Sequence, residues 1–308
     1  MKNYLSLHLQ GKQLLKYWIP TYILFVVFIA VYAIYTYKLS ESFTGIGSGL
    51  LVLLAALSFI VVVYIFYYYV IKLTTDGMEY KEDHLESHYT FSNFLATLLG
   101  GLLLSVVTLG IYFPWFIQHL YSFFIDGSSY RGNRFTFKAD GLTLFGILTL
   151  LVIIPSIAIT LIITGFYGPE SLMESIVSNS YSLISLPILY TLVIKWMVDG
   201  EFNGYKIKLN AKVFPMIGYL FMHLILAIIT VGIYFPMFYL RIYKYTLQHV
   251  GCTNDAGESI TLDYDIEPAS DFLFMWGQLL LVIVTVGFYT PWAYSKVMKR
   301  ILGKTSLA

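Results

Sequence analysis

The sequence predicts an all-α polytopic membrane protein, built from internal repeats of membrane helix pairs or hairpins that are joined by short cytoplasmic β-strands. Three observations predict this fold class. Of the 308 residues, 58% are hydrophobic and only 12% are charged, whereas soluble domains usually carry about 25% charged residues. Apolar segments long enough to cross a bilayer recur along the chain, and one eight-residue motif occurs three times. Because so few charges could not cover this much apolar surface in water, the composition excludes a soluble protein.

The first apolar run, Trp18–Tyr37, follows Lys2, Lys12 and Lys16 and is interpreted as a retained membrane helix. It is too long for the apolar part of a secretory signal, and no small-residue cleavage site follows it. The single cysteine, Cys252, excludes an internal disulfide. A net charge of +1 argues against a nucleic-acid partner, which would require a concentrated basic face.

Further along the chain, a spanning helix needs roughly 20 mostly apolar residues. Four segments meet this length: Trp18–Tyr37, Leu50–Ile71, Leu142–Phe166 and Tyr181–Met197. Three others are too long for one span: Phe91–Ile125, Phe214–Leu247 and Phe272–Leu302. Each of these three is interrupted by the repeated motif.

The motif reads TLGIYFPW at Thr108–Trp115, TVGIYFPM at Thr230–Met237 and TVGFYTPW at Thr285–Trp292. It predicts a helix break, because glycine permits positive φ and proline removes a backbone donor. Its aromatic rings suit the headgroup level of a bilayer, so the break is expected at a membrane interface. The residues assigned to this structural motif are Thr108, Gly110, Tyr112, Pro114, Trp115, Thr230, Gly232, Tyr234, Pro236, Thr285, Gly287, Tyr289, Pro291 and Trp292.

Short stretches between the apolar segments alternate polar and apolar residues with period two, which predicts strands. They are Tyr4–Leu9, Ser87–Phe91, Arg134–Lys138, Tyr205–Leu209 and Ser259–Tyr264. Each is followed by membrane segments and a polar turn, so we predict one membrane domain of about five degenerate repeats. The predicted boundaries are 1–85, 86–133, 134–203, 204–258 and 259–308. We expect the strands to pair into a small sheet, because isolated strands leave backbone groups unpaired.

The strand side carries most of the basic residues, including Arg131, Lys138 and Lys206. The positive-inside rule therefore places the strands in the cytoplasm. Strands on one face require an even number of crossings in each repeat. The three motif-containing segments are then hairpins whose second arms re-enter the membrane. The alternative is that these second arms lie on the membrane surface as basic amphipathic helices.

The second arms carry the candidate ligand-binding residues. In a cavity they would attract an anion, such as a lipid phosphate; the alternative is that long basic side chains reach out to the headgroups. Placing a histidine in the hydrocarbon core of a bilayer costs free energy, so histidines within membrane segments usually face the interior of the helix bundle. There they line a site or make an interhelical hydrogen bond. The candidates are Arg241, Lys244, Lys296, Lys299, Arg300, His119 and His223.

Two further histidines, His84 and His88, are spaced for zinc binding on a helix. The surrounding period-two pattern predicts a strand, which would separate them, so we interpret this segment as a solvated loop. We therefore expect no metal site and no cofactor. The sequence also lacks a nucleophile elbow, a phosphate-binding loop and a dinucleotide fingerprint, so we expect no enzymatic activity.

The first motif and its following strand, Arg131–Phe137, resemble the YjgN-like family of uncharacterised bacterial inner-membrane proteins. Residues Tyr4–Lys12 resemble the opening strand and turn of that family. The family's arm after the motif usually carries several basic residues, whereas here His119 is the only titratable group. The resemblance implies a multi-pass protein of the bacterial inner membrane and no known activity. Genes for such proteins often neighbour those for membrane-linked zinc peptidases, which hints at a membrane protein partner.

Two functions remain open at the level of the sequence. Internal repeats with broken helices and intramembrane charge are features of transporter sites, so the chain is interpreted as a transporter or as a protein that handles lipid or anions. That function predicts a polar cavity lined by Arg241, Lys244 and Lys296. The alternative is a membrane scaffold or partner subunit, without a cavity. The expected partners are the lipid bilayer, an anionic lipid or small anion, and a membrane protein.

Overall fold

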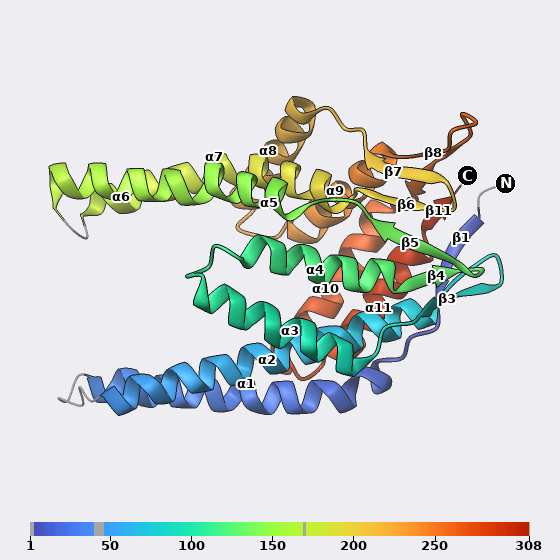
Figure 1. Ribbon diagram of the computed structural model, residues 1–308. Coiled ribbons are helices and arrows are strands. Elements are labelled where there is room, and N and C mark those ends of the chain that lie inside the picture. The colour runs from blue at the N-terminus through green and yellow to red at the C-terminus, as the bar shows by residue number, and fades with distance from the viewer. Residues whose placement is uncertain (1–2, 40–45, 169–170, 308) are drawn as a thin grey trace.

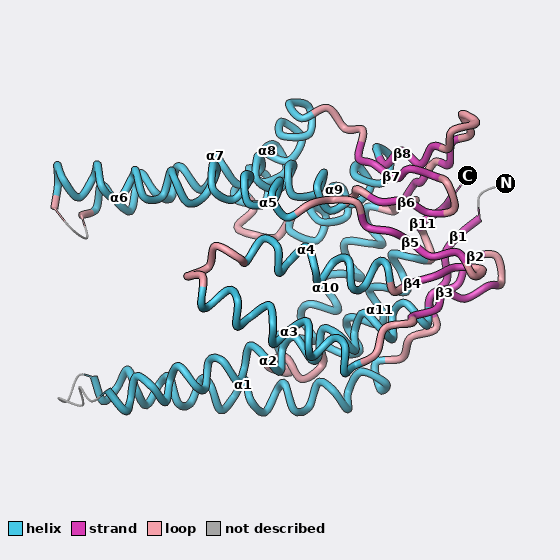
Figure 2. Tube along the Cα trace, viewed as in Figure 1, coloured by secondary structure: helices cyan, strands magenta, loops and turns pink. Residues whose placement is uncertain are grey.

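The computed structural model describes residues 3–39, 46–168 and 171–307; Lys2, counted above among the basic residues, lies outside them. The described strands gather at one end of the molecule and the helices extend from that end, as Figures 1 and 2 show. The first and last described residues, Asn3 and Leu307, are paired in adjacent strands at that end. The molecule therefore has a strand end and an opposite end where helices turn.

The described chain repeats the order strand, helical hairpin, strand five times. The first unit contains β1 (Asn3–Leu7), α1 (Gly11–Leu39), α2 (Ile46–Gly77) and β2 (Met78–Tyr80). The second contains β3 (Asp83–Ser87), α3 (Phe91–Val107), α4 (Phe113–Asp126) and β4 (Ser128–Tyr130). The third contains β5 (Asn133–Phe137), α5 (Gly141–Leu148), the π-helical turn η1 (Thr149–Ile153), α6 (Ile154–Tyr167), α7 (Leu172–Met197) and β6 (Gly200–Phe202). The fourth contains β7 (Tyr205–Leu209), α8 (Val213–Ile229), α9 (Phe235–His249) and β8 (Val250–Thr253). After β9 (Ser259–Ile260), the fifth contains β10 (Leu262–Tyr264), α10 (Pro268–Val284), α11 (Thr290–Leu302) and β11 (Thr305–Leu307).

One backbone hydrogen bond recurs in all five units. The residue that follows the first strand donates its N–H to the carbonyl of the residue just before the second strand. The pairs are His8 to Gly77 (2.7 Å), His88 to Gly127 (2.7 Å), Lys138 to Asp199 (2.9 Å), Asn210 to His249 (2.8 Å) and Asp265 to Lys304 (2.9 Å). The units therefore share local geometry as well as element order.

The eleven described strands form one antiparallel sheet in the order β10-β11-β1-β2-β3-β4-β5-β6-β7-β8-β9. Three hairpins between units use two-residue turns with positive φ, such as Arg131 (+51°) and Gly132 (+77°), which match the twist of antiparallel strands. The edge strands β9 and β10 are separated only by Thr261, so the sheet is a nearly closed barrel.

The all-α class predicted from the sequence is wrong, because an eleven-stranded sheet is a major part of the fold. The second strand of most units is only three residues long, as in Met78–Tyr80, and three residues are too few to show a period. One predicted strand is also misplaced. β3 is Asp83–Ser87 rather than Ser87–Phe91, since Phe91 already begins α3.

The apolar face of the sheet lies inside the barrel. Tyr80, Tyr130 and Phe202 belong to alternate strands, yet the ring of Tyr130 lies 6.0 Å from that of Tyr80 and 6.4 Å from that of Phe202. The Tyr130 hydroxyl also donates to the Tyr80 carbonyl at 2.8 Å. Strands two apart in a flat sheet lie about 9.6 Å apart, so these side chains converge on a concave face.

The helices pack in the same circular order as the units. The second helix of each unit contacts the first helix of the next unit, and α11 contacts α1. Well-buried side chains lie where strands and helices meet, as in the cluster of Leu7 with Leu14 and Val70, and between helices, as in the cluster that contains Tyr68, Phe94 and Phe116. Side chains farther from the sheet are largely exposed and apolar.

Four helical segments are long and apolar enough to cross a membrane, by length and composition: Gly11–Ile34, Val52–Gly77, Gly141–Tyr167 and Leu172–Met197. At most 11% of the apolar window in each is buried inside the protein, which supports association with a membrane. They form two long hairpins, α1–α2 and α5–α7, which reach farthest from the sheet (Figure 1). The other three units form short hairpins, α3–α4, α8–α9 and α10–α11, whose first helices have 17 residues each.

Candidate functional site

The repeated motif forms the turn of each short hairpin. In the first copy, Leu109 and Gly110 have φ values of +53° and +89°. Gly110 donates its N–H to the carbonyl of Ser105 (2.7 Å), and Leu109 donates to that of Val106 (3.1 Å). This pair of bonds closes a helix C-terminus, and it requires two successive residues with positive φ, which is unusual for a leucine.

The motif threonine satisfies the backbone that the turn leaves open. The Thr108 hydroxyl donates to the carbonyl of Leu104 (2.7 Å) and accepts from the N–H of Tyr112 (3.0 Å). Thr230 and Thr285 make the same two contacts at similar distances. Because an unpaired backbone group costs several kcal/mol in lipid, this arrangement lets the turn exist without water.

The outermost side chain of each turn is apolar and exposed: Leu109 is 93% exposed, Val231 90% and Val286 72%. By contrast, the last motif position packs onto the next unit. A Cβ on Gly141 would lie 2.5 Å from the Trp115 ring, and a Cβ on Gly11 would lie 2.7 Å from Trp292. The tryptophans therefore join neighbouring units, and the interface placement expected for the motif stays a prediction.

Each motif tyrosine is held by a polar side chain of its own hairpin. The Tyr234 hydroxyl and His223 Nδ1 are 2.8 Å apart, and those of Tyr112 and His119 are 3.3 Å apart. The Tyr289 hydroxyl accepts from Lys296 Nζ at 2.8 Å. Three of the candidate ligand-binding residues therefore contact motif tyrosines, and His223 is only 3% exposed.

Arg300 has a structural partner, the buried carboxylate of Asp271, which is fully buried at the sheet end of α10. Asp271 Oδ1 accepts from Arg300 Nε at 2.7 Å and from Lys304 Nζ at 2.7 Å. Burial alone would raise the pKa of Asp271. Hydrogen bonds from Lys304, from the Glu267 N–H and from Arg300 outweigh it, so the pKa lies below its ordinary value. This carboxylate therefore holds two cations that sequence reasoning left unpaired.

The other basic candidates also have separate surroundings. Lys244 Nζ donates to the carbonyl of Tyr264 at 2.9 Å, and Arg241 is exposed on α9. Lys299 is exposed on α11. The five basic residues therefore do not converge on one site, and none of them lines either apolar cavity described next.

Two apolar cavities are walled mainly by the second helices of the units. One, of about 400 Å³, lies between α9, α10 and α11 and is lined by Tyr239, Ala293 and Tyr294 among others. The other, of about 530 Å³, lies between α2 and α4 and includes Tyr67 and Tyr121. The hydroxyl of Tyr294, which lines the first cavity, lies 3.0 Å from that of Thr74 on α2, the helix that lines the second, so the two cavities lie on contacting helices. Sequence reasoning missed these tyrosines, because it assigned most tyrosines to membrane interfaces.

Residues 2–127 match the model of a family described as a bacterial protein of unknown function, DUF898. No curated protein and no solved structure matches the chain. The first two units, from β1 to α4, are therefore similar to a bacterial domain family of unknown function.

Proposed function

We propose that the chain is a multi-pass protein of the bacterial inner membrane that handles lipids by taking acyl chains into its two apolar cavities. The cavity between α9, α10 and α11 carries this proposal. Its lining is almost entirely apolar, with Tyr239, Gln278, Thr290 and Tyr294 as the polar exceptions. Cavities of about 300–1,000 Å³ with such a lining are typical of ligand sites.

The hairpin lengths support the membrane placement. The 32 residues of α2 span about 48 Å, whereas the 17 residues of α3 span about 26 Å. With the sheet on the cytoplasmic side, the long hairpins would cross a hydrocarbon core of about 30 Å and the short hairpins would end inside it. The self-satisfied turns and their exposed apolar tips suit that depth.

The charge distribution favours lipid chains over small anions as the ligand. Of the residues expected from the sequence to line an anion cavity, Lys244 donates to a strand carbonyl and Lys296 to the Tyr289 hydroxyl. Neither these two nor Arg241 lines either cavity. A scaffold without transport predicts a compact bundle, whereas the cavities predict a protein that binds and moves lipid.

A photoreactive lipid tests the proposal. The protein would be reconstituted in phosphatidylethanolamine and phosphatidylglycerol vesicles that contain a phospholipid with a diazirine at the end of one acyl chain. We expect crosslinks at Tyr239 and Tyr294. Filling the cavity with Ala293→Phe should lower them about tenfold, since overpacking costs about 1–3 kcal/mol. The control Ala96→Phe, on the exposed face of α3, should leave them unchanged.

Crosslinks restricted to outward-facing side chains such as Leu103, and equal in both variants, would refute acyl-chain uptake. The scaffold function would then be the better description.

A further inference from the structure

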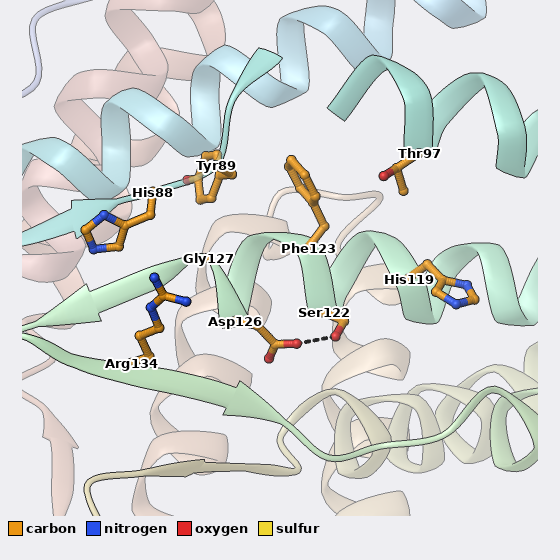
Figure 3. A pocket seen from close by; sticks show the side chains of 9 residues that line it. All are labelled: His88, Tyr89, Thr97, His119, Ser122, Phe123, Asp126, Gly127 and Arg134. Carbon is orange, nitrogen blue, oxygen red and sulfur yellow. Dashed lines mark hydrogen bonds between the residues drawn. The ribbon is translucent and has the colours of Figure 1, made fainter. Parts of the chain in front are cut away.

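A polar pocket of about 430 Å³ lies on the second unit, where the sheet meets the α3–α4 hairpin (Figure 3). Its polar lining comes from three elements and the loop that follows β3. Arg134 extends from β5, Asp126 and His119 belong to α4, and His88 follows β3. Thr97 closes the far end from α3. Neither the family match nor the cavity function assigns a role to this pocket.

The pocket contains a guanidinium, from Arg134, and a carboxylate, from Asp126, and both can form further hydrogen bonds. Within the described residues the guanidinium of Arg134 makes no hydrogen bond or ion pair, and Figure 3 shows it beside the C-terminal end of α4. Asp126 accepts from the Phe137 N–H (2.6 Å) and from the Ser122 hydroxyl. A carboxylate offers about four acceptor positions, so Asp126 can accept further hydrogen bonds.

The remaining titratable groups around the pocket are the two histidines, Tyr89, whose hydroxyl donates to Thr75, and the carboxylate of Glu86. His88 Nε2 lies 2.7 Å from the Ser129 hydroxyl and 3.7 Å from Glu86 on β3. His119 Nδ1 lies 3.3 Å from the Tyr112 hydroxyl. Each histidine retains a second ring nitrogen that can donate or accept.

The position of the pocket matches the headgroup layer. His88 directly follows β3, and Asp126 is the last residue of α4. Thr97 lies six residues after Phe91, where α3 begins, and His119 lies seven residues before Asp126. Each distance is about 10 Å along the helix axis at 1.5 Å per residue. In the proposed membrane placement, the pocket therefore extends from the cytoplasmic surface into the first part of the bilayer.

We propose that this pocket binds the headgroup of a zwitterionic phospholipid that has a primary ammonium, as in phosphatidylethanolamine. Arg134 binds the phosphate diester through paired N–H donors, a geometry that guanidinium favours. His88 supplies a further contact to the phosphate. Asp126 accepts from the ammonium, which has three N–H donors. The assignment rests on the proposed membrane placement and is independent of acyl-chain uptake by the cavities.

The carboxylate makes the pocket selective. Asp126 would repel phosphatidylglycerol and inorganic phosphate, which have no cation to neutralise it. A quaternary ammonium, as in phosphatidylcholine, has no N–H to donate. We therefore expect the pocket to bind phosphatidylethanolamine more tightly than phosphatidylcholine or phosphatidylglycerol.

The test measures lipid binding to the full chain in detergent micelles by native mass spectrometry. The probes are phosphatidylethanolamine, phosphatidylcholine and phosphatidylglycerol with identical acyl chains, together with water-soluble glycerophosphoethanolamine. Arg134→Gln should weaken phosphatidylethanolamine binding about tenfold, because it removes charge-assisted hydrogen bonds. The matched control is Arg131→Gln, since Arg131 pairs with Asp83 outside the pocket, and it should bind like the unmodified protein.

Asp126→Asn should abolish the preference for phosphatidylethanolamine over phosphatidylcholine, while its side-chain oxygen can still accept from Phe137. Size-exclusion elution identical to the unmodified protein confirms that each variant is folded. Equal losses in Arg134→Gln and Arg131→Gln, or phosphatidylglycerol binding as tightly as phosphatidylethanolamine, would overturn the proposal. Equal affinity for glycerophosphoethanolamine would overturn the assignment to a membrane lipid. Acyl crosslinks at Tyr294 should persist in Arg134→Gln, which separates failure of this site from failure of the proposed function.

Discussion

Removing the Asp271 carboxylate tests the role assigned to it. The variant Asp271→Asn keeps the shape of the side chain but removes the counter-charge of Arg300, and it leaves Lys304 with only Glu267, at 3.3 Å. Breaking a buried ion pair costs about 3–5 kcal/mol; because Arg300 and Lys304 are 24% and 18% exposed, we expect about 2–3 kcal/mol. The control, Asp255→Asn, removes an exposed partner of Lys206 and should have little effect.

The assay uses Cys252, the single cysteine, which is 9% exposed in β8. Burial raises the pKa of its thiol, so it should react slowly with a fluorogenic maleimide in the folded protein. When opening is fast relative to labelling, the rate follows the open population. A loss of about 2–3 kcal/mol should then accelerate labelling about 30- to 150-fold in Asp271→Asn.

The pH dependence provides a second reading of the same carboxylate. The pKa of Asp271 is lower in the folded state than its unfolded value near 3.8. Its contribution to stability is therefore present above about pH 4 and is lost as the pH falls through the folded pKa. Cys252 labelling after incubation below pH 4 should rise more steeply in the unmodified protein than in Asp271→Asn. Parallel pH profiles, or equal labelling of Asp271→Asn and Asp255→Asn, would refute the reasoning.

Three further predictions concern the short hairpins. Gly101→Ala should destabilise the α3–α4 contact by about 1–3 kcal/mol, because its Cβ would overlap the Phe116 ring. The control Gly100→Ala, whose Cβ meets nothing within 4 Å, should stabilise the protein by about 0.5–1 kcal/mol. Thermal unfolding measures both effects. Thr285→Val should lower stability by about 1–3 kcal/mol, since it leaves the Tyr289 N–H without an acceptor in a turn that the proposed placement puts in hydrocarbon. An unchanged melting temperature would argue against that placement. A cysteine at Leu109, in a Cys252→Ser background, should resist a membrane-impermeant maleimide from both sides, and rapid labelling from either side would place the turn in water.

The long helices were predictable because about 20 consecutive apolar residues have no alternative to the bilayer. The barrel was not predictable, because its pairing is non-local: β1 pairs with β11, which lies about 300 residues away in the sequence. Nothing in the residues of β11 (Thr305–Leu307) specifies that neighbour. The all-α prediction therefore failed because strands of three residues acquire meaning only from their partners.

The basic cluster shows the same limit at the level of single side chains. Arg300 could be recognised as a cation in a membrane-proximal helix, but its partner Asp271 lies 29 residues earlier. Only the packing of α10 against α11 brings the two together and buries the carboxylate. Motif residues were easier to identify, because the turn bonds of Gly110 and Thr108 are local and follow from residue type.

The internal repeats explain why the short hairpins carry polar groups where the long hairpins need none. In each short hairpin, the residue seven positions after the motif tyrosine is basic or histidine: His119, Arg241 and Lys296. His119 and Lys296 contact their tyrosine hydroxyl directly, whereas the hydroxyl of Tyr234 contacts His223 in place of Arg241. A hairpin that ends inside the bilayer cannot fix its turn in the opposite headgroup layer, so a contact within the hairpin has to hold the turn instead. The long hairpins turn beyond the hydrocarbon core in the proposed placement, where water and headgroups can satisfy their turns. In the proposed placement, the contact of the motif tyrosine with His119, His223 or Lys296 therefore holds the turn of a hairpin that ends within the bilayer.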